Sequence, residues 1–115
     1  MISHVVLFRP KLSLTGEERR TMVTVLAAAI DGIPQIKRFT VGKRILLNRP
    51  GYETQMAEHY EYSAIMEFES EADLRAYLDH PAHHQLGQLL FTMADAVLAY
   101  DFDCVGADRL SDLLK

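Results

Sequence analysis

The hydrophobic residues along the chain follow two spacings, and each spacing predicts a different element. Apolar and polar residues that alternate with a period of two are typical of a strand with one buried face. Apolar residues three and four positions apart are typical of a helix that buries one side. By these criteria we expect strands at 2–9, 36–47, 59–69 and 97–102. We expect helices at 15–31, 70–79 and 81–94, and a short helix or loose tail at 107–115.

Local signals predict where these helices begin and end. Thr15 and Glu18 have the spacing of a capping box, in which each side chain bonds the backbone of the other residue. Gly32, followed by Pro34, is a stop signal for the same helix. Ser70 is a favoured residue just before the next helix.

Two features interrupt the pattern of the second strand and its connection to the third. Gly42 lies inside the second strand, where a glycine indicates either a bulge or a close backbone approach. The segment 48–58 contains the pair Pro50-Gly51 and mixed polar residues, so we expect a loop there.

The predicted elements follow the order β-α-β-β-α-β, with the second helix broken in two. This order is the split βαβ, or ferredoxin-like, arrangement of the α+β class. It predicts one four-stranded antiparallel sheet with helices on one face. The other face must meet water or a partner, and a second copy of the chain is the simplest cover. We place the domain at 1–103 and treat 104–115 as a C-terminal extension.

Composition narrows the range of partners and locations. A length of 115 residues is typical of one domain, and 49% hydrophobic residues are enough for a core. The net charge of −4 argues against nucleic acids and anionic membranes, which attract basic surfaces. Cys104 is the single cysteine, so the chain forms no internal disulfide, and a reducing, cytoplasmic location fits best. The apolar run at 5–8 is too short for a signal peptide or a membrane span.

The stretch 77–84, Tyr-Leu-Asp-His-Pro-Ala-His-His, holds three of the five histidines. A proline disfavours helix in the residue before it but suits the first position of a new helix. We therefore expect one helix to end just before a corner at His80, and a second helix to begin at Pro81. In this geometry the phenol of Tyr77 and the imidazole of His83 converge on one pocket. Imidazole exchanges protons near neutral pH, which makes His83 a candidate general base or acid.

Other chemistries find less support in the sequence. His80 and His83 have a spacing that metal sites use, but Pro81 breaks the helix between them, and no cysteine or carboxylate pair completes a site. Neither a Gly-x-Gly-x-x-Gly motif nor a serine nucleophile elbow is present. We expect no metal ion and no cofactor. For His83, the alternative to catalysis is a structural histidine that only hydrogen-bonds a backbone carbonyl.

Four segments carry a resemblance to a known family. They are Met-Ile-Ser-His-Val-Val-Leu-Phe-Arg at 1–9, Ile-Pro-Gln-Ile at 33–36 with Val-Gly at 41–42, Phe-Glu-Ser at 68–70, and Tyr-Leu-Asp-His-Pro-Ala-His at 77–83. Together they resemble the stress-responsive α/β-barrel domain family over roughly 1–103. Members of that family form dimeric α+β barrels, so the resemblance implies a homodimer with two sheets closed together and helices outside. Most members have no assigned reaction, but a plant polyketide cyclase uses the tyrosine and second histidine of Tyr-x-x-His-Pro-x-His for an intramolecular aldol step.

Carried over by position, the resemblance makes Tyr77 and His83 the catalytic candidates. The substrate-binding candidates are His4, Tyr62, Met22, Leu26 and His80. His80 also fits a purely structural role at the corner. Tyr62 stands where the cyclase has a histidine, and the loop 48–58 and the first helix differ as well, so the identity of the substrate does not carry over.

Two hypotheses follow. In the first, the protein is a homodimer that binds a small-molecule ligand, a small and mostly apolar carbonyl or aromatic compound; any enzyme activity would be that of a cofactor-free cyclase or isomerase. His83 would remove a proton and Tyr77 would bond the enolate oxygen. In the second, the protein is a non-catalytic, stress-associated protein that forms a dimer or a higher assembly. An open pocket where Tyr77 and His83 face each other favours the first hypothesis, and a filled cavity, or His83 bonded only to backbone, favours the second.

Overall fold

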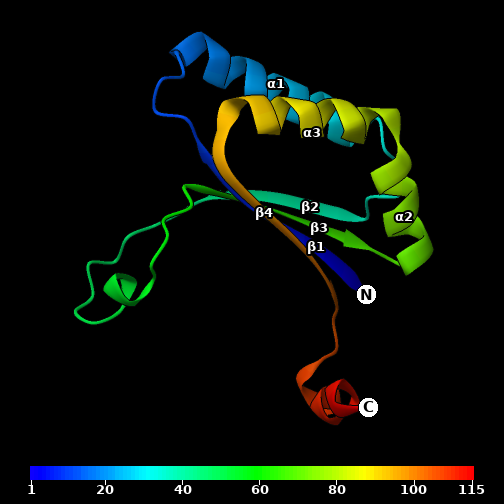
Figure 1. The fold of residues 1–115 in the computed structure, drawn as a ribbon. Coiled ribbons are helices and arrows are strands. Elements are labelled where there is room, and N and C mark those ends of the chain that lie inside the picture. The colour runs from blue at the N-terminus through cyan, green and yellow to red at the C-terminus, as the bar shows by residue number, and fades with distance from the viewer.

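The computed structural model describes all 115 residues, which form a sheet and a layer of helices (Figure 1). The four strands are β1 (Ile2–Pro10), β2 (Arg38–Lys43), β3 (Tyr62–Phe68) and β4 (Ala94–Asp103). The helices are α1 (Gly16–Asp31), α2 (Glu71–Asp79) and α3 (Pro81–Met93). Two short 3₁₀ helices, η1 (Glu53–Gln55) and η2 (Ala107–Leu114), lie away from these layers. None of the helices is long and apolar enough to span a lipid bilayer.

The strands form one antiparallel sheet in the order β2-β3-β1-β4, and the three α-helices lie on one of its faces (Figure 1). The first helical connection, α1, joins β1 to β2, which run parallel with β3 between them. The second, formed by α2 and α3, joins β3 to β4 across β1. This topology confirms the predicted ferredoxin-like α+β fold.

Capping residues define the starts of α1 and α2, as the sequence predicts. Thr15 Oγ1 accepts a hydrogen bond from the N–H of Glu18, and the Glu18 carboxylate accepts one from the N–H of Thr15. Ser70 accepts a hydrogen bond from the N–H of Asp73 at 3.2 Å. These bonds satisfy N–H groups that have no partner within the first turn of a helix.

The break between α2 and α3 falls at His80 and Pro81. His80 has an extended backbone (φ −69°, ψ 137°), because the residue before a proline avoids the helical region. Its Nδ1 accepts a hydrogen bond from the N–H of Ala82 at 3.0 Å, so the imidazole caps the start of α3. Pro81 occupies the first helical position, where its missing N–H leaves no bond unmade. The chain therefore turns sharply at this corner (Figure 1).

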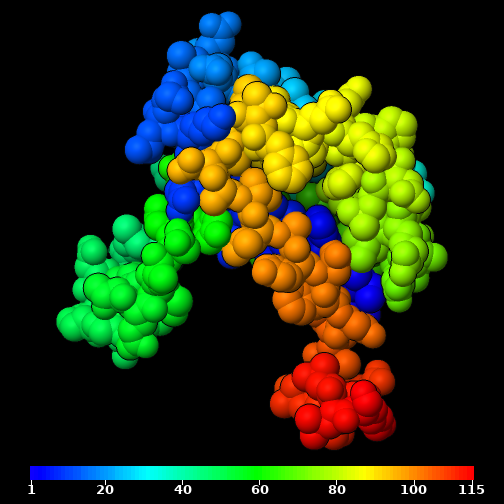
Figure 2. All heavy atoms as spheres, in the orientation of Figure 1, coloured from blue at the N-terminus to red at the C-terminus, as the bar shows by residue number.

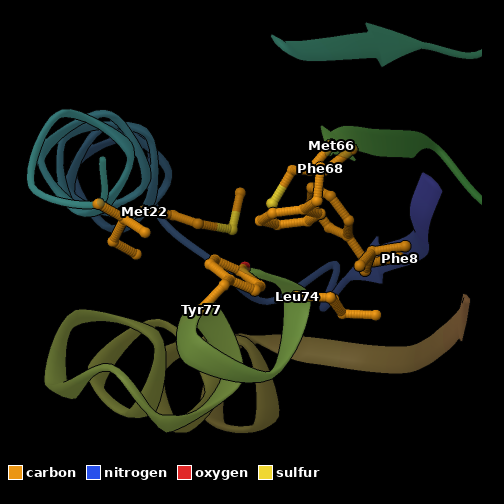
Figure 3. Close-up of a cluster of buried hydrophobic side chains, with 9 residues drawn as sticks. Phe8, Met22, Met66, Phe68, Leu74 and Tyr77 are labelled. Carbon is orange, nitrogen blue, oxygen red and sulfur yellow. The ribbon is translucent and has the colours of Figure 1, made fainter. Parts of the chain in front are cut away.

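The core lies between the helices and the inner face of the sheet, and Figure 3 shows part of it. Phe68, Met66 and Tyr77 are its largest fully buried side chains. The strand register places His4 of β1 opposite Met66 of β3 and opposite Asp101 of β4. Directly opposed residues on antiparallel strands point to the same face, so His4 and Asp101 both lie on the helix-covered side.

The paired part of the hairpin between β2 and β3 is shorter than predicted. β2 ends at Lys43 and β3 begins at Tyr62, so both predicted strands extended too far into the connection. The last backbone bond between them joins the N–H of Arg44 to the carbonyl of Glu61 at 2.7 Å. Beyond it, the segment 44–61, which contains the predicted loop, projects away from the sheet (Figure 1).

Gly42 does not form a bulge. The pairing of β2 with β3 is continuous through Gly42, and a Cβ at this position would lie 3.3 Å from Oγ of Ser63. The missing side chain at Gly42 therefore leaves room for the close side chain of Ser63. The sheet irregularity lies instead between Arg9 and Pro10, where proline has no N–H to contribute to the ladder.

No helix covers the other face of the sheet (Figure 1), and Met56, Glu58 and Tyr60 of the β2–β3 connection line a pocket with Leu7 and Leu98 at one end of it. This face carries apolar side chains from three strands, which we call the open sheet face: Val5, Leu7, Ile65, Leu98, Tyr100 and Phe102. Tyr100 and Phe102 expose 58% and 52% of their surface. A contiguous exposed apolar patch is typical of a surface that contacts another protein.

Candidate functional site

A mostly apolar cavity lies between the inner face of the sheet and the helices. Its volume is about 290 Å³, and 13 of its 17 lining residues are hydrophobic. Small residues on both sides create the space, namely Ala64 and Ala99 on the sheet and Gly87 on α3. A Cβ added at Gly87 would meet no atom within 4 Å. Figure 2 shows the surface hollowed between the helices and β4, with atoms of β1 inside the recess.

Three aromatic rings and a carboxylate form the polar end of this cavity. The ring of Tyr77 lies edge-on to the ring of His83, with centroids 4.7 Å apart, and edge-on to the ring of His4, at 5.6 Å. Asp101 lies beside His4. Tyr77 comes from the last turn of α2, His83 from the first turn of α3, His4 from β1 and Asp101 from β4. Four separate elements therefore build the polar end.

The environment of His83 favours the neutral imidazole. Its Nδ1 lies 3.1 Å from the carbonyl oxygen of Leu78, so Nδ1 carries the proton and donates it to that oxygen. Nε2 keeps its lone pair and has no protein partner. Burial lowers the pKa of His83 below its ordinary value of 6.5, because the loss of water disfavours the charged ring. The bond to Leu78 acts in the opposite direction, and the nearby His4 and His84 lower the pKa further.

The environment of Tyr77 favours the protonated phenol. The residue is only 2% exposed, and its hydroxyl makes no hydrogen bond with the protein. Burial raises the pKa of Tyr77 to about 12, and the negative charge of Asp101 acts in the same direction. At neutral pH the hydroxyl is therefore available as a hydrogen-bond donor to a bound molecule.

His4 and Asp101 form a close pair next to Tyr77. His4 Nδ1 donates to Asp101 Oδ1 at 2.6 Å, which leaves Nε2 of His4 as the free ring nitrogen. His4 is buried, whereas the side chain of Asp101 is 45% exposed and lies at the rim of the cavity. Asp101 was absent from the candidates drawn from the sequence. Its signal was available in the alternation of Val97, Ala99 and Asp101 along β4, which places all three on the inner face.

The cavity contains five of the seven site residues named from the sequence: His83, Tyr77, His4, Met22 and Leu26. The other two, Tyr62 and His80, do not line it. The ring of Tyr62 stacks on that of Phe8 with centroids 5.4 Å apart, and the imidazole of His80 caps α3. The part of the wall that α3 supplies through Gly87, Leu90 and Phe91 was not among the predicted site residues. No group of three or more His, Cys, Asp or Glu side chains is arranged to hold a metal ion.

Comparisons with known proteins agree with this fold. Residues 2–104 match the family model described as Stress responsive A/B Barrel Domain. A dimeric ferredoxin-like protein of unknown function from Thermobifida fusca superposes with a TM-score of 0.71 at 25% identity, over 90% of each chain. A protein from Arabidopsis thaliana gives 0.74 at 22% identity, over 93% of this chain and 98% of that chain. The hydroxynitrile lyase from Passiflora edulis gives 0.78 at 13% identity, over 92% and 94%.

No curated protein matches the sequence at a significant level. The family assignment therefore depends on the family model, which covers nearly the whole chain. The residues that match the family model include all four strands and the residues at the polar end of the cavity. The chain belongs to the stress responsive A/B barrel domain family.

Proposed function

We propose that the protein is a homodimer whose cavity binds a small, mostly apolar carbonyl or aromatic compound and catalyses a cofactor-free proton transfer on it. The observation that carries this proposal is a neutral imidazole beside a protonated phenol at the polar end of an apolar cavity. A volume of about 290 Å³ is near the lower limit of ligand pockets, which suits a small compound. The fold is compatible with catalysis, since a hydroxynitrile lyase shares it.

In the proposed reaction, His83 is the general base. Its Nε2 takes a proton from the carbon next to the substrate carbonyl, and the imidazole becomes an imidazolium ion. The electron pair of the broken C–H bond moves into the carbonyl group, which becomes an enolate. Leu78 supports this role because its carbonyl fixes the tautomer that presents Nε2 as the base. The imidazolium later returns the proton to a different atom of the product, so the enzyme ends unchanged.

Tyr77 is the group that stabilises the enolate. Its hydroxyl donates a hydrogen bond to the substrate oxygen, and this bond strengthens as negative charge develops there. The pKa of about 12 keeps the proton on the phenol throughout. The apolar walls exclude competing water, which makes a single well-placed donor more effective than it would be in solution.

The open sheet face supports the homodimer part of the proposal. Val5, Ile65 and Tyr100 lie side by side across three strands, and nothing within one chain covers them. A second copy that packs its own open sheet face on this one buries both patches at once, as a twofold interface requires. The Thermobifida fusca neighbour is dimeric, which supports a dimer of this fold.

One observation favours a second candidate function, that of a non-catalytic, stress-associated assembly. The only hydrogen bond of the His83 side chain goes to the backbone carbonyl of Leu78, as expected of a histidine that stabilises the corner between α2 and α3. Under this alternative, the open sheet face is the essential feature and the cavity is a packing space.

Proton exchange distinguishes the two candidates without knowledge of the natural substrate. Propiophenone, a small aromatic ketone, exchanges the protons next to its carbonyl slowly in D₂O, and NMR follows this exchange directly. We expect the wild-type protein to accelerate the exchange and His83→Ala to lose at least ~100-fold of that acceleration. His84→Ala is the matched control, because His84 neighbours His83 on α3 but is exposed and lies outside the cavity.

The outcome of this assay distinguishes the enzyme from the structural assembly. Exchange that depends on His83 and not on His84 supports the enzyme. Equal acceleration by wild type and His83→Ala removes His83 from the role of base. A wild-type protein that dimerises but accelerates no exchange, for this ketone or for its aliphatic analogues, favours the structural assembly.

A further inference from the structure

We infer that Asp101 makes the cavity selective for neutral ligands over anionic ones, so that carboxylates and other anions bind more weakly. This inference rests on the proposed function in one respect, that the cavity is the ligand site. It adds the charge class of the ligand and names the residue that determines it. The argument comes from the charges that line the cavity and from the position of Asp101 at its rim.

The cavity has no fixed positive charge to receive an anion. No lysine or arginine is among its 17 lining residues, and Asp101 is its one acidic residue. The other titratable groups in the cavity are the imidazoles of His4 and His83 and the phenol of Tyr77. On the side away from the cavity, Asp101 lines a second pocket with Glu71, Arg75 and Asp103, where Arg75 is paired with Glu71. Sites for carboxylates and phosphates normally supply arginine, lysine or several backbone N–H groups. No arginine or lysine side chain lies at the polar end of this cavity.

Asp101 is placed so that an entering ligand meets its charge. One oxygen, Oδ1, accepts from His4 at 2.6 Å, while Oδ2 has no hydrogen-bond partner in the protein. The side chain is 45% exposed and lines the same cavity as the buried rings of His4 and Tyr77. A ligand that places a neutral polar group against Tyr77 and His83 also brings that group near Asp101.

The charge of Asp101 already acts on one neighbour in the cavity. It disfavours the negative phenolate of Tyr77 and so contributes, after burial, to the raised pKa of that residue. An anionic ligand bound beside Tyr77 would experience the same repulsion. Two like charges ~6 Å apart at an effective dielectric constant of ~20 weaken binding roughly 100-fold. Because Asp101 is half-exposed, we expect a smaller effect, of at least ~10-fold.

Two probes of similar size and shape test this inference, 4-butylphenol as the neutral ligand and 4-butylbenzoate as the anion. Calorimetry or ligand-observed NMR at about pH 8, where the phenol is neutral and the benzoate is charged, gives both dissociation constants. We expect wild-type protein to bind the phenol at least ~10-fold more tightly. Asp101→Asn keeps an oxygen for the His4 bond but removes the charge, and should reduce this preference at least ~5-fold. Asp103→Asn, the same change two residues along β4 and outside the cavity, should leave the preference unchanged.

A second measurement needs no variant and covers the case in which Asp101→Asn does not fold. Added salt screens the repulsion, so binding of 4-butylbenzoate should strengthen relative to 4-butylphenol as the salt concentration rises. Equal affinities in the wild type, a preference insensitive to salt, or equal effects of the two Asn variants would overturn the role of Asp101 and leave the cavity as a ligand site. Failure of both probes to bind at all would count against the ligand site itself, and with it against this inference.

Discussion

Replacing Tyr77 with phenylalanine separates the chemistry of the proposed site from the stability of the fold. The substitution removes one hydroxyl and keeps a ring that is 2% exposed and packs against Phe68, with centroids 5.3 Å apart. A buried hydroxyl without a partner costs about 1–3 kcal/mol of desolvation. Here the hydroxyl reaches a cavity roomy enough for water, which reduces that cost. We therefore expect the free energy of unfolding to change by no more than about 1 kcal/mol.

The same substitution should have a large effect on proton transfer. Removal of one donor from a site that stabilises a developing oxyanion typically lowers the rate ~10²–10³-fold. Urea unfolding followed by circular dichroism measures the stability, and the deuteration of propiophenone measures the activity. Tyr77→Ala provides the contrast, because loss of the whole ring from the core should destabilise the protein by about 3–5 kcal/mol. Tyr77→Phe should match the wild type in its free energy of unfolding, and it should match an inactive variant in its rate of proton exchange.

Two results would refute this reasoning. A loss of more than about 2 kcal/mol of stability in Tyr77→Phe would mean that the hydroxyl has a structural partner, and that the site is not free to bind a substrate oxygen. Exchange at the wild-type rate would mean that no hydrogen bond from Tyr77 stabilises the enolate. Either result would leave the apolar cavity without the donor that the proposed mechanism requires.

Two further predictions concern pH and assembly. Because burial lowers the pKa of His83, the exchange rate should fall to half its maximum only below pH 6.5, as the folded protein takes up the proton; a midpoint at or above pH 6.5 would contradict the lowered pKa. On the open sheet face, Tyr100→Ser with Phe102→Ser should weaken the dimer at least ~10-fold in sedimentation equilibrium, since two half-exposed aromatic rings lose their burial. Phe91→Ser, which alters an exposed ring on α3, is the control, and equal effects would place the interface elsewhere.

Features that depend on neighbouring residues in the sequence could be predicted. The capping box of Thr15 and Glu18 involves bonds within one turn, and the corner at Pro81 follows from the steric limits of a single residue. The alternation of His4, Val6 and Phe8 along the sequence likewise predicts one face of β1 for all three residues, and this face is the inner one. In each case, the relevant interactions span a few residues, so the sequence contains the whole cause.

Features that depend on pairing between distant segments could not be predicted in the same way. The partnership of His4 with Asp101 joins residues 97 positions apart and depends on the register of β1 with β4, which no local pattern specifies. Tyr62 illustrates the opposite error. Its alternation with Ala64 and Met66 predicts the inner face of β3, where it lies, but its distance along β3 from the polar end depends on how the helices pack over the sheet. A face can be predicted from alternation, whereas a position within a cavity needs the tertiary arrangement.

The corner at Pro81 explains how two residues of one short stretch can act as a pair. In an uninterrupted α-helix, residues six positions apart differ by about 120° in direction and by about 9 Å along the axis, so Tyr77 and His83 would face different surroundings. The break at His80 reorients the chain between them, and their rings meet at 4.7 Å. The imidazole of His80 holds the new helix in place through the N–H of Ala82. His80 therefore contributes by positioning His83, which accounts for its place in the same stretch although it does not line the cavity.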